Sequence, residues 1–234
     1  AAPQYLAWGG LLIGVLFGAL VERTRFCAMG ALSDLTSFGD ARRLRAWLLA
    51  SAVALIGAQL LHGWGVVDIG LSMYHAPRLN WLGNILGGVL FGIGMVFAGG
   101  CASRNLVRLG GGDLRAAVVL GVIGVFAYMT LGGVLGPLRA ALESATSIDL
   151  PGASSQSVAA LLSYATQLPA DLARWSITAL LAGGLLMYCL SDAAFRQAPS
   201  QVLGGVGVGL CVTAAWAVTG LAYDDFAEVP QWPQ

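Results

Sequence analysis

Charge is scarce in this sequence. Only 10% of the 234 residues are charged, lysine is absent, and 57% of the residues are hydrophobic. A water-soluble domain carries roughly 25% charged residues, so this composition cannot cover a water-facing surface. The twelve arginines balance twelve acidic residues, and a net charge of zero gives no electrostatic basis for binding nucleic acid. The composition predicts a polytopic membrane protein whose partner is the lipid bilayer.

Histidine and cysteine are also rare, with two and four copies. His62 and His75 share no ligand spacing with any cysteine, so no metal site is expected. Nucleophilic catalysis by a thiol needs a base beside it, and no histidine lies near Cys27 or Cys101 in the sequence. We therefore expect that the protein is not an enzyme and holds no metal or cofactor.

Six apolar segments are long enough, or nearly so, to cross the bilayer as helices, which takes about 20 residues. They are residues 5–21, 46–67, 81–99, 114–138, 175–190 and 202–223. Residues 26–38 are too polar to span and predict either a short re-entrant helix or a cytoplasmic turn. Residues 158–165 carry apolar side chains at helical spacing, which favours a helix on the membrane surface. The predicted fold class is all-α, with residues 1–234 forming a single transmembrane domain.

The chain contains an internal repeat. The sequence GVLFG at residues 14–18 recurs at residues 88–92, and the same offset carries Cys27-Ala28 onto Cys101-Ala102. We place the two repeat units at approximately residues 8–67 and 82–138. Glycines four residues apart mark most spans, and such small-residue stripes allow helix backbones to approach closely where lipid gives no hydrophobic drive for association. These glycines are Gly10/Gly14/Gly18, Gly83/Gly87, Gly88/Gly92, Gly132/Gly136 and Gly205/Gly209.

Each repeated cysteine stands where an apolar helix stops. Gly99-Gly100 is expected to end one helix just before Cys101, and a new helical turn is expected to begin at Ala102 or Ser103. The free N–H groups of a new helix favour an anion. Irregular backbone at membrane depth is tolerated only where it is buried or lines a cavity, and transporters place such half-helix ends at substrate sites.

This pattern predicts a substrate site with thiol, N–H and polar contacts. The predicted site residues are Cys27, Cys101, Gly99, Gly100, Ala102, Ser103, Arg104 and Asn105. The two thiols would offer soft sulfur and weak S–H donors, and Ser103 and Asn105 would stabilise negative charge. Cys189 and Cys211 are interpreted as small buried apolar residues.

Two motifs carry a resemblance to a known family. Residues 25–31 (RFCAMGA, with Asp34 following) and residues 99–112 (GGCASRNLVRLGGG) resemble the YeeE/YedE family of bacterial inner-membrane proteins. Weaker support comes from residues 215–220 and 229–231. The resemblance implies an hourglass-shaped helical membrane protein with pseudo-symmetric halves. It also implies uptake of thiosulfate, with the ion passed between cysteine thiols, and a cytoplasmic TusA-like sulfur carrier as partner.

The resemblance places Cys27 and Cys101 at the first two functional cysteines of the family. The third lies in a further glycine-glycine-cysteine motif, and the expectation is that this chain corresponds to the N-terminal two thirds of a family member. The sequence Ser103-Arg104-Asn105-Leu106 departs from the glycine-containing sequence of thiosulfate carriers, which leaves the substrate open.

Three functions follow as hypotheses. The leading one is a transporter or channel for a small sulfur-containing anion of a thiosulfate-like kind, in the bacterial inner membrane. Its thiols make weak serial contacts, and no covalent step is required. The alternative is a structural or accessory subunit of a larger membrane assembly, in which the cysteines would be replaceable. The third is a thiol-redox membrane enzyme, which would form a Cys27–Cys101 disulfide.

Overall fold

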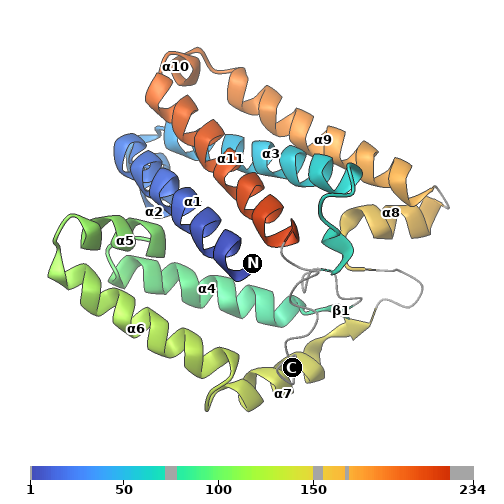
Figure 1. Ribbon diagram of the computed structural model, residues 1–234, viewed down its shortest axis with the longest axis horizontal. Coiled ribbons are helices and arrows are strands. Elements are labelled where there is room, and N and C mark those ends of the chain that lie inside the picture. The colour runs from blue at the N-terminus through green and yellow to red at the C-terminus, as the bar shows by residue number, and fades with distance from the viewer. Residues whose placement is uncertain (1, 72–77, 150–154, 167–168, 222–234) are drawn as a thin grey trace. The chain divides into compact units, whose positions relative to one another are not determined.

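The computed structural model describes residues 2–71, 78–149, 155–166 and 169–221 (Figure 1). This part of the chain is almost entirely helical, so the predicted all-α class is confirmed. The elements are α1 (Ala2–Thr24), α2 (Ala28–Phe38), α3 (Arg42–Gly63), η1 (Ile69–Leu71), β1 (Arg78–Leu79), α4 (Trp81–Phe97), α5 (Ala102–Gly110), α6 (Leu114–Leu131), α7 (Gly136–Thr146), β2 (Ile148–Asp149), α8 (Val158–Thr166), α9 (Ala170–Leu190), α10 (Ala193–Arg196) and α11 (Pro199–Leu221).

Six helical segments of the described chain are long and apolar enough to cross a membrane, and they correspond to the six predicted spans. Many of their large apolar side chains, such as Leu12, Leu90 and Leu180, are exposed on the chain surface. Such a surface is stable only in contact with lipid. The protein is therefore a multi-pass membrane protein.

The short helices and the span ends refine the prediction. Residues 26–38, left open between a helix and a turn, form helix α2 from Ala28 onward, and the helix predicted near residue 158 is α8. The fourth span was predicted to reach residue 138, but α6 ends at Leu131. It stops there because the N–H groups of Gly132 and Gly133 both turn back onto the Tyr128 carbonyl. The last two residues of the sixth predicted span lie outside the described residues.

The described residues group into two compact units, one formed by those within 2–26, 39–71 and 178–221 and the other by those within 27–38 and 78–177. In the first unit, α11 packs against both α1 and α3 (Figure 1). The approach is close enough to require glycine. A Cβ on Gly205 would lie 2.8 Å from the Ala46 carbonyl oxygen, and one on Gly209 would lie 2.8 Å from that of Ala50. The predicted packing of this glycine pair is confirmed.

The glycines of α1 behave differently. A Cβ on Gly10, Gly14 or Gly18 would meet no atom within 4 Å in the part of the chain that the structure describes. The predicted helix contact along this stripe is therefore not formed there. Cys189 and Cys211 are both buried, as predicted. The Cys189 thiol donates to the Arg45 carbonyl oxygen at 3.3 Å, which gives it a structural contact between α9 and α3.

In the second unit, α5 packs against α6, and α7 contacts both α4 and α6. The strands β1 and β2 form one short antiparallel pair with Arg78 opposite Asp149. The connection from α5 to α6 is fixed by Asp113, whose carboxylate accepts a hydrogen bond from the Arg115 N–H and so caps the first turn of α6. This arrangement holds the segment from α4 through α5 that contains Cys101.

Candidate functional site

The end of α4 forms a Schellman motif immediately before Cys101. The Gly100 N–H donates to the Met95 carbonyl at 3.1 Å, and the Gly99 N–H donates to the Val96 carbonyl at 3.2 Å. Gly99 has φ +64°, the left-handed conformation that this motif requires at the residue after the helix cap. Gly100 continues with φ +155°. The predicted helix stop at the double glycine is confirmed, although α4 itself ends at Phe97, two residues before the predicted end at residue 99.

The end of α1 forms the same motif immediately before Cys27. The Phe26 N–H donates to the Val21 carbonyl at 3.2 Å, and the Arg25 N–H donates to the Glu22 carbonyl at 3.4 Å. Arg25 has φ +52° and is the one non-glycine residue with positive φ in the described chain. The repeat offset places Arg25 on Gly99 and Phe26 on Gly100. We call residues 24–27 the first break and residues 98–101 the second break. Each hydrogen bond of the first break has its equivalent in the second break.

Both cysteines then precede the first turn of the next helix. The Cys27 carbonyl accepts a hydrogen bond from the Ala31 N–H at 2.9 Å, and the Cys101 carbonyl accepts one from the Asn105 N–H at 3.1 Å. Cys101 is the N-cap residue of α5, has an extended backbone and makes no side-chain hydrogen bond that caps the helix. The free N–H groups at the start of α5 remain available to a ligand.

The two sulfur atoms lie in contact. Cys27 Sγ and Cys101 Sγ are 3.8 Å apart, although the residues are 74 positions apart in the sequence. Cys27 is buried and Cys101 is half-buried, and both thiols are free. Either sulfur can act as the donor to the other. At this separation one small anion can contact both thiols from the same side.

Helix α5 places two arginine side chains near the double glycine, Arg104 from its first turn and Arg108 from its last turn. The Arg104 side chain lies against Gly100, where an added Cβ would be 3.0 Å from Arg104 Cδ. The Arg108 guanidinium lies near Gly99, at 3.6 Å from an added Cβ, and forms an ion pair with Asp113. Arg104 is exposed and has no carboxylate partner among the described residues. Its positive charge beside the break is therefore the uncompensated one of the two.

Two aspartates fix the loops that follow α2 and α5. Hydrogen bonds from Arg108, supported by the Arg115 N–H, hold the pKa of the Asp113 carboxyl below its ordinary value. Hydrogen bonds from Arg42 hold the pKa of the Asp40 carboxyl below its ordinary value. Both carboxylates are consequently charged at neutral pH. Asp113 is the N-cap residue of α6, whereas Asp40 precedes Ala41, the N-cap residue of α3, and accepts a hydrogen bond from the Arg42 N–H.

Asn105 is placed differently from the other predicted site residues. Ala102 and Ser103 are half-buried at the start of α5, whereas Asn105 is fully buried with 0% of its surface exposed. Asn105 Nδ2 lies 3.4 Å from the Ala98 carbonyl oxygen and 3.3 Å from the carbonyl oxygens of Gly100 and Cys101. Its Oδ1 is buried and has no hydrogen-bond partner in the described part of the chain. The amide N–H groups of Asn105 therefore donate to backbone carbonyls between the end of α4 and the start of α5.

Gln201 was missed by the sequence analysis. Its Nε2 donates to the Thr24 carbonyl oxygen at 3.4 Å, from a position 177 residues away in the sequence. The repeat offset places Thr24 on Ala98, the carbonyl that Asn105 approaches. No local pattern marks Gln201, because its contact depends on the packing of α11 against the end of α1.

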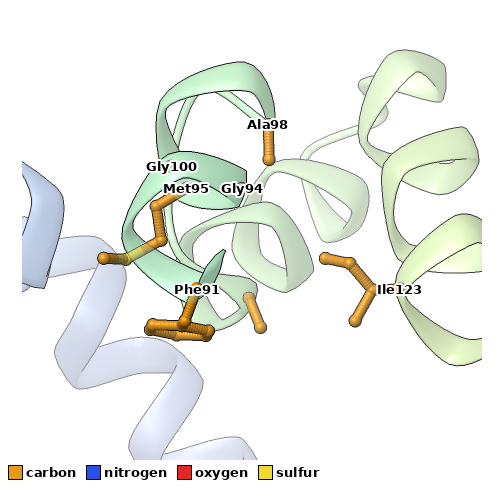
Figure 2. A pocket seen from close by; sticks show the side chains of 7 residues that line it. Phe91, Gly94, Met95, Ala98, Gly100 and Ile123 are labelled. Carbon is orange, nitrogen blue, oxygen red and sulfur yellow. The ribbon is translucent and has the colours of Figure 1, made fainter. Parts of the chain in front are cut away.

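An apolar cavity adjoins the break in the second unit. Its volume is about 170 Å³, and Figure 2 shows the side chains of Phe91, Met95 and Ile123 around it. Gly100 and Ala102, the two neighbours of Cys101 in the chain, also line it. The described residues contain no group of three or more His, Cys, Asp or Glu side chains that could hold a metal ion.

Comparison with known proteins identifies the family. Residues 23–228 match the family model described as sulphur transport. The chain is 34% identical over 126 residues to the thiosulfate transporter TsuA of Escherichia coli, covering 54% of this chain and 33% of that protein. It is 38% identical over 128 residues to TsuA of Spirochaeta thermophila, covering 55% and 37%. It is also 37% identical over 100 residues to the probable transporter YedE of Salmonella typhimurium, covering 42% and 23%. The matched stretch thus spans about a third of the length of the two TsuA relatives. The chain belongs to the sulphur transport family, the YeeE/YedE family that its two cysteine motifs resemble.

Proposed function

We propose that this protein is a membrane transporter or channel for a small sulfur-containing anion of the thiosulfate type, and that Cys27 and Cys101 contact the ion. The observation that carries the proposal is the 3.8 Å separation of the two free thiols at matching helix breaks. Membership of the sulphur transport family and the two TsuA relatives support the substrate class. No chemical conversion of the ion is part of the proposal.

The site offers two kinds of contact, and thiosulfate has two kinds of end. Its terminal sulfur is soft and accepts weak hydrogen bonds from the thiols of Cys27 and Cys101. Its oxygens carry the harder negative charge and accept from the N–H groups of Ala102 and Ser103 at the start of α5. The exposed Arg104 adds an uncompensated positive charge beside the break. A thiol pair next to a cationic helix start therefore distinguishes thiosulfate from an anion with oxygen alone.

The apolar cavity beside Cys101 favours this selectivity. Its lining of Phe91, Met95 and Ile123 offers no hydrogen bond to water or to an oxyanion. A low local dielectric strengthens the attraction between the ion and the N–H groups. The individual contacts stay weak, since a thiol is a weak donor, and weak contacts let the ion leave as well as enter. We place the protein in the bacterial inner membrane, with a cytoplasmic TusA-like sulfur carrier as the recipient of the ion.

The proposal is tested by uptake of ³⁵S-thiosulfate into cells that lack other thiosulfate uptake and express the wild-type protein or a variant. Cys27→Ala and Cys101→Ala should each lower the rate roughly tenfold, because about 1 kcal/mol of hydrogen bonding and the shape of the site are lost. Cys211→Ala is the matched control, since this buried cysteine lies on α11 away from both breaks in the sequence, and it should keep the wild-type rate.

Competition with unlabelled ions sharpens the test. Excess sulfate should compete poorly because it has no soft sulfur for the thiols, whereas excess thiosulfate should abolish the signal. Wild-type uptake in both Cys27→Ala and Cys101→Ala would refute the thiol contacts and favour an accessory role for this chain.

A further inference from the structure

We infer that Asn105 and Gln201 are positioning residues. Their carboxamide groups hold the two cysteines in place by capping equivalent carbonyls, that of Ala98 in the second repeat and that of Thr24 in the first. This inference rests on the proposed function of the cysteine pair. It changes the role of Asn105 from a predicted ion contact to a residue that acts through Cys101. It also brings in Gln201, which no sequence motif marks.

The capped carbonyls are equivalent. Ala98 is the C-cap residue of α4, and Thr24 is the last residue of α1 at the matching repeat position. The final carbonyls of a helix have no partner within the helix. Inside a membrane no water replaces that partner, so each such carbonyl needs a donor from the protein. Asn105 Nδ2 lies 3.4 Å from the Ala98 oxygen, and Gln201 Nε2 lies 3.4 Å from the Thr24 oxygen.

The donor is local in one repeat and distant in the other. Asn105 belongs to α5, so it closes the second break from the helix that follows. The equivalent residue of the first repeat is Ala31, which is buried and carries no donor. There Gln201 arrives from α11 instead. Gly204 on α11 makes room for this approach, because an added Cβ would lie 2.7 Å from Thr24 Oγ1. The first repeat therefore has no amide at the position of Asn105, and the more distant Gln201 caps the equivalent carbonyl instead.

Asn105 reaches further than a cap requires. Its Nδ2 lies 3.3 Å from the carbonyl oxygens of both Gly100 and Cys101, so a single amide connects the end of α4 to the backbone of the cysteine itself. Two N–H groups cannot fully satisfy three carbonyls, so the contacts are shared and depend on the exact path of residues 98–101. A displacement of Cys101 would break them. The amide therefore resists the movement that would separate Cys101 Sγ from Cys27 Sγ.

Packing alone does not account for Asn105. Its buried Oδ1 has no hydrogen-bond partner among the residues that the structure describes, which is unfavourable for stability. An alanine would fill the core of this turn without an unpaired acceptor, as Ala31 does in the first repeat. The contacts of Asn105 Nδ2 with the backbone carbonyls of residues 98–101 explain why an asparagine stands here.

The experiment measures the cysteine positions directly, without transport. Purified full-length protein carrying Cys189→Ala and Cys211→Ala is treated with diamide, which accepts two electrons and two protons as the two remaining thiols of this chain join in a disulfide. Formation of the Cys27–Cys101 bond is followed by mass spectrometry of the linked peptides. The unsubstituted pair should close readily, because the sulfurs are already in contact at 3.8 Å. Asn105→Ala and Gln201→Ala should each slow disulfide formation at least fivefold, and Asn105→Ala should have the larger effect because it removes an amide that lies near three carbonyls rather than one.

Isosteric variants separate the donor from the volume. Asn105→Asp and Gln201→Glu keep the shape but remove the N–H donors, and they should slow closure as the alanine variants do. Gln59→Ala, on α3, removes a half-buried glutamine that lies outside both breaks and should close at the unsubstituted rate. Thermal unfolding in detergent confirms that each compared variant is folded. If Asn105→Ala does not fold, Gln201→Ala and Gln201→Glu decide the test.

If the Cys27–Cys101 disulfide forms in the folded Asn105 and Gln201 variants at the rate of the unsubstituted protein, the inference is overturned. The disulfide readout also separates this inference from the proposed function. Slow closure with unchanged thiosulfate uptake supports the positioning role and contradicts the role of the thiols in transport. Where the proposed function holds, the same variants should raise the half-saturating thiosulfate concentration more than Gln59→Ala does.

Discussion

The break after α1 and the break after α4 share one backbone and differ in their side chains. In both, a residue in the left-handed conformation follows the helix, and two backbone hydrogen bonds close the Schellman motif. The left-handed residue is Gly99 in the second repeat but Arg25 in the first. A non-glycine residue in that conformation costs about 1–2 kcal/mol. The pairing of backbone groups at the helix end therefore fixes the geometry, even where the residue is unfavourable for it.

The next position shows how each break is held. In the first repeat it is Phe26, which is buried and stacks on Trp47 with ring centroids 5.9 Å apart. In the second it is Gly100, which is buried with φ +155° and lies under the Arg104 side chain. The first break is therefore anchored by aromatic packing within its unit, whereas the second depends on glycine backbone and on the amide of Asn105. The second break should be the more sensitive to small changes.

Gly100→Ala tests that sensitivity and should have the largest effect. A φ of +155° is open to glycine and is strained for alanine, so the substitution should lower the free energy of unfolding by about 1–3 kcal/mol. The new Cβ would also lie 3.0 Å from Arg104 Cδ, which a flexible side chain can relieve. The measurement is denaturant or thermal unfolding of the purified protein in detergent.

Gly88→Ala in α4 is the control for Gly100→Ala. No described atom lies within 4 Å of a Cβ at Gly88, and alanine is up to about 1 kcal/mol more favourable than glycine within a helix. This control should therefore retain or raise the stability. A loss in Gly88→Ala equal to that in Gly100→Ala would show that the second break is not special.

Exchanging the left-handed residues should have a smaller effect, of opposite sign in the two repeats. Gly99→Ala should lower the free energy of unfolding by about 1 kcal/mol, because a Cβ is unfavourable at φ +64°. Arg25→Gly should raise it by up to about 1 kcal/mol, because the strain at φ +52° is removed. Gly99→Asn is the matched control, since asparagine tolerates this conformation, and it should fall between wild type and Gly99→Ala. Changes of the same sign in both repeats would contradict the equivalence of the two breaks.

Much of the fold follows from patterns that are local in the sequence. The six spans follow from runs of apolar residues, and the stop at Gly99-Gly100 follows from two glycines before a polar turn. The meeting of Cys27 with Cys101 was expected from the repeat, because equivalent breaks place equivalent residues. The end of α6 at Leu131 was missed because residues 132–138 are as apolar as a span, and only the turn at Gly132 and Gly133 distinguishes them.

The positioning residues Asn105 and Gln201 were harder to predict than the two cysteines. Asn105 was assigned to the ion because a polar side chain near a helix start suggests a ligand contact. Its amide lies instead among three carbonyls, which depends on how the chain bends between α4 and α5. Gln201 gave no signal at all, since its partner Thr24 is brought near by the packing of α11. Such side-chain-to-backbone contacts follow from tertiary structure and have no sequence periodicity.

The loops that leave the two cysteine segments give the smallest expected effect. Asp40 and Asp113 each accept a backbone hydrogen bond from the first turn of the following helix, at 2.9 Å from the Arg42 nitrogen and 3.0 Å from the Arg115 nitrogen, and Asp113 is the N-cap residue of its helix. The guanidinium partner of Asp40 is Arg42, within the same turn, whereas that of Asp113 is Arg108, from the preceding helix. Only the second pair therefore connects two helices, α5 and α6.

The pH dependence follows from the direction of the two shifts. Both pKa values are lowered from 3.8, so each carboxylate stabilises the folded protein fully above that value and less as the pH falls through the folded-state pKa. Acidification from pH 6 to pH 3 should therefore lower the unfolding temperature of the wild-type protein.

Asp113→Asn retains a capping side chain but removes the ion pair and the titration, so it should slightly lower the unfolding temperature at pH 7 and reduce the acid-induced change. Asp40→Asn should lower the pH 7 value less, because its ion pair joins residues two positions apart that the hydrogen bond from the Arg42 N–H already links. An equal or larger loss in Asp40→Asn would mean that the link between α5 and α6 through Arg108 contributes nothing to stability.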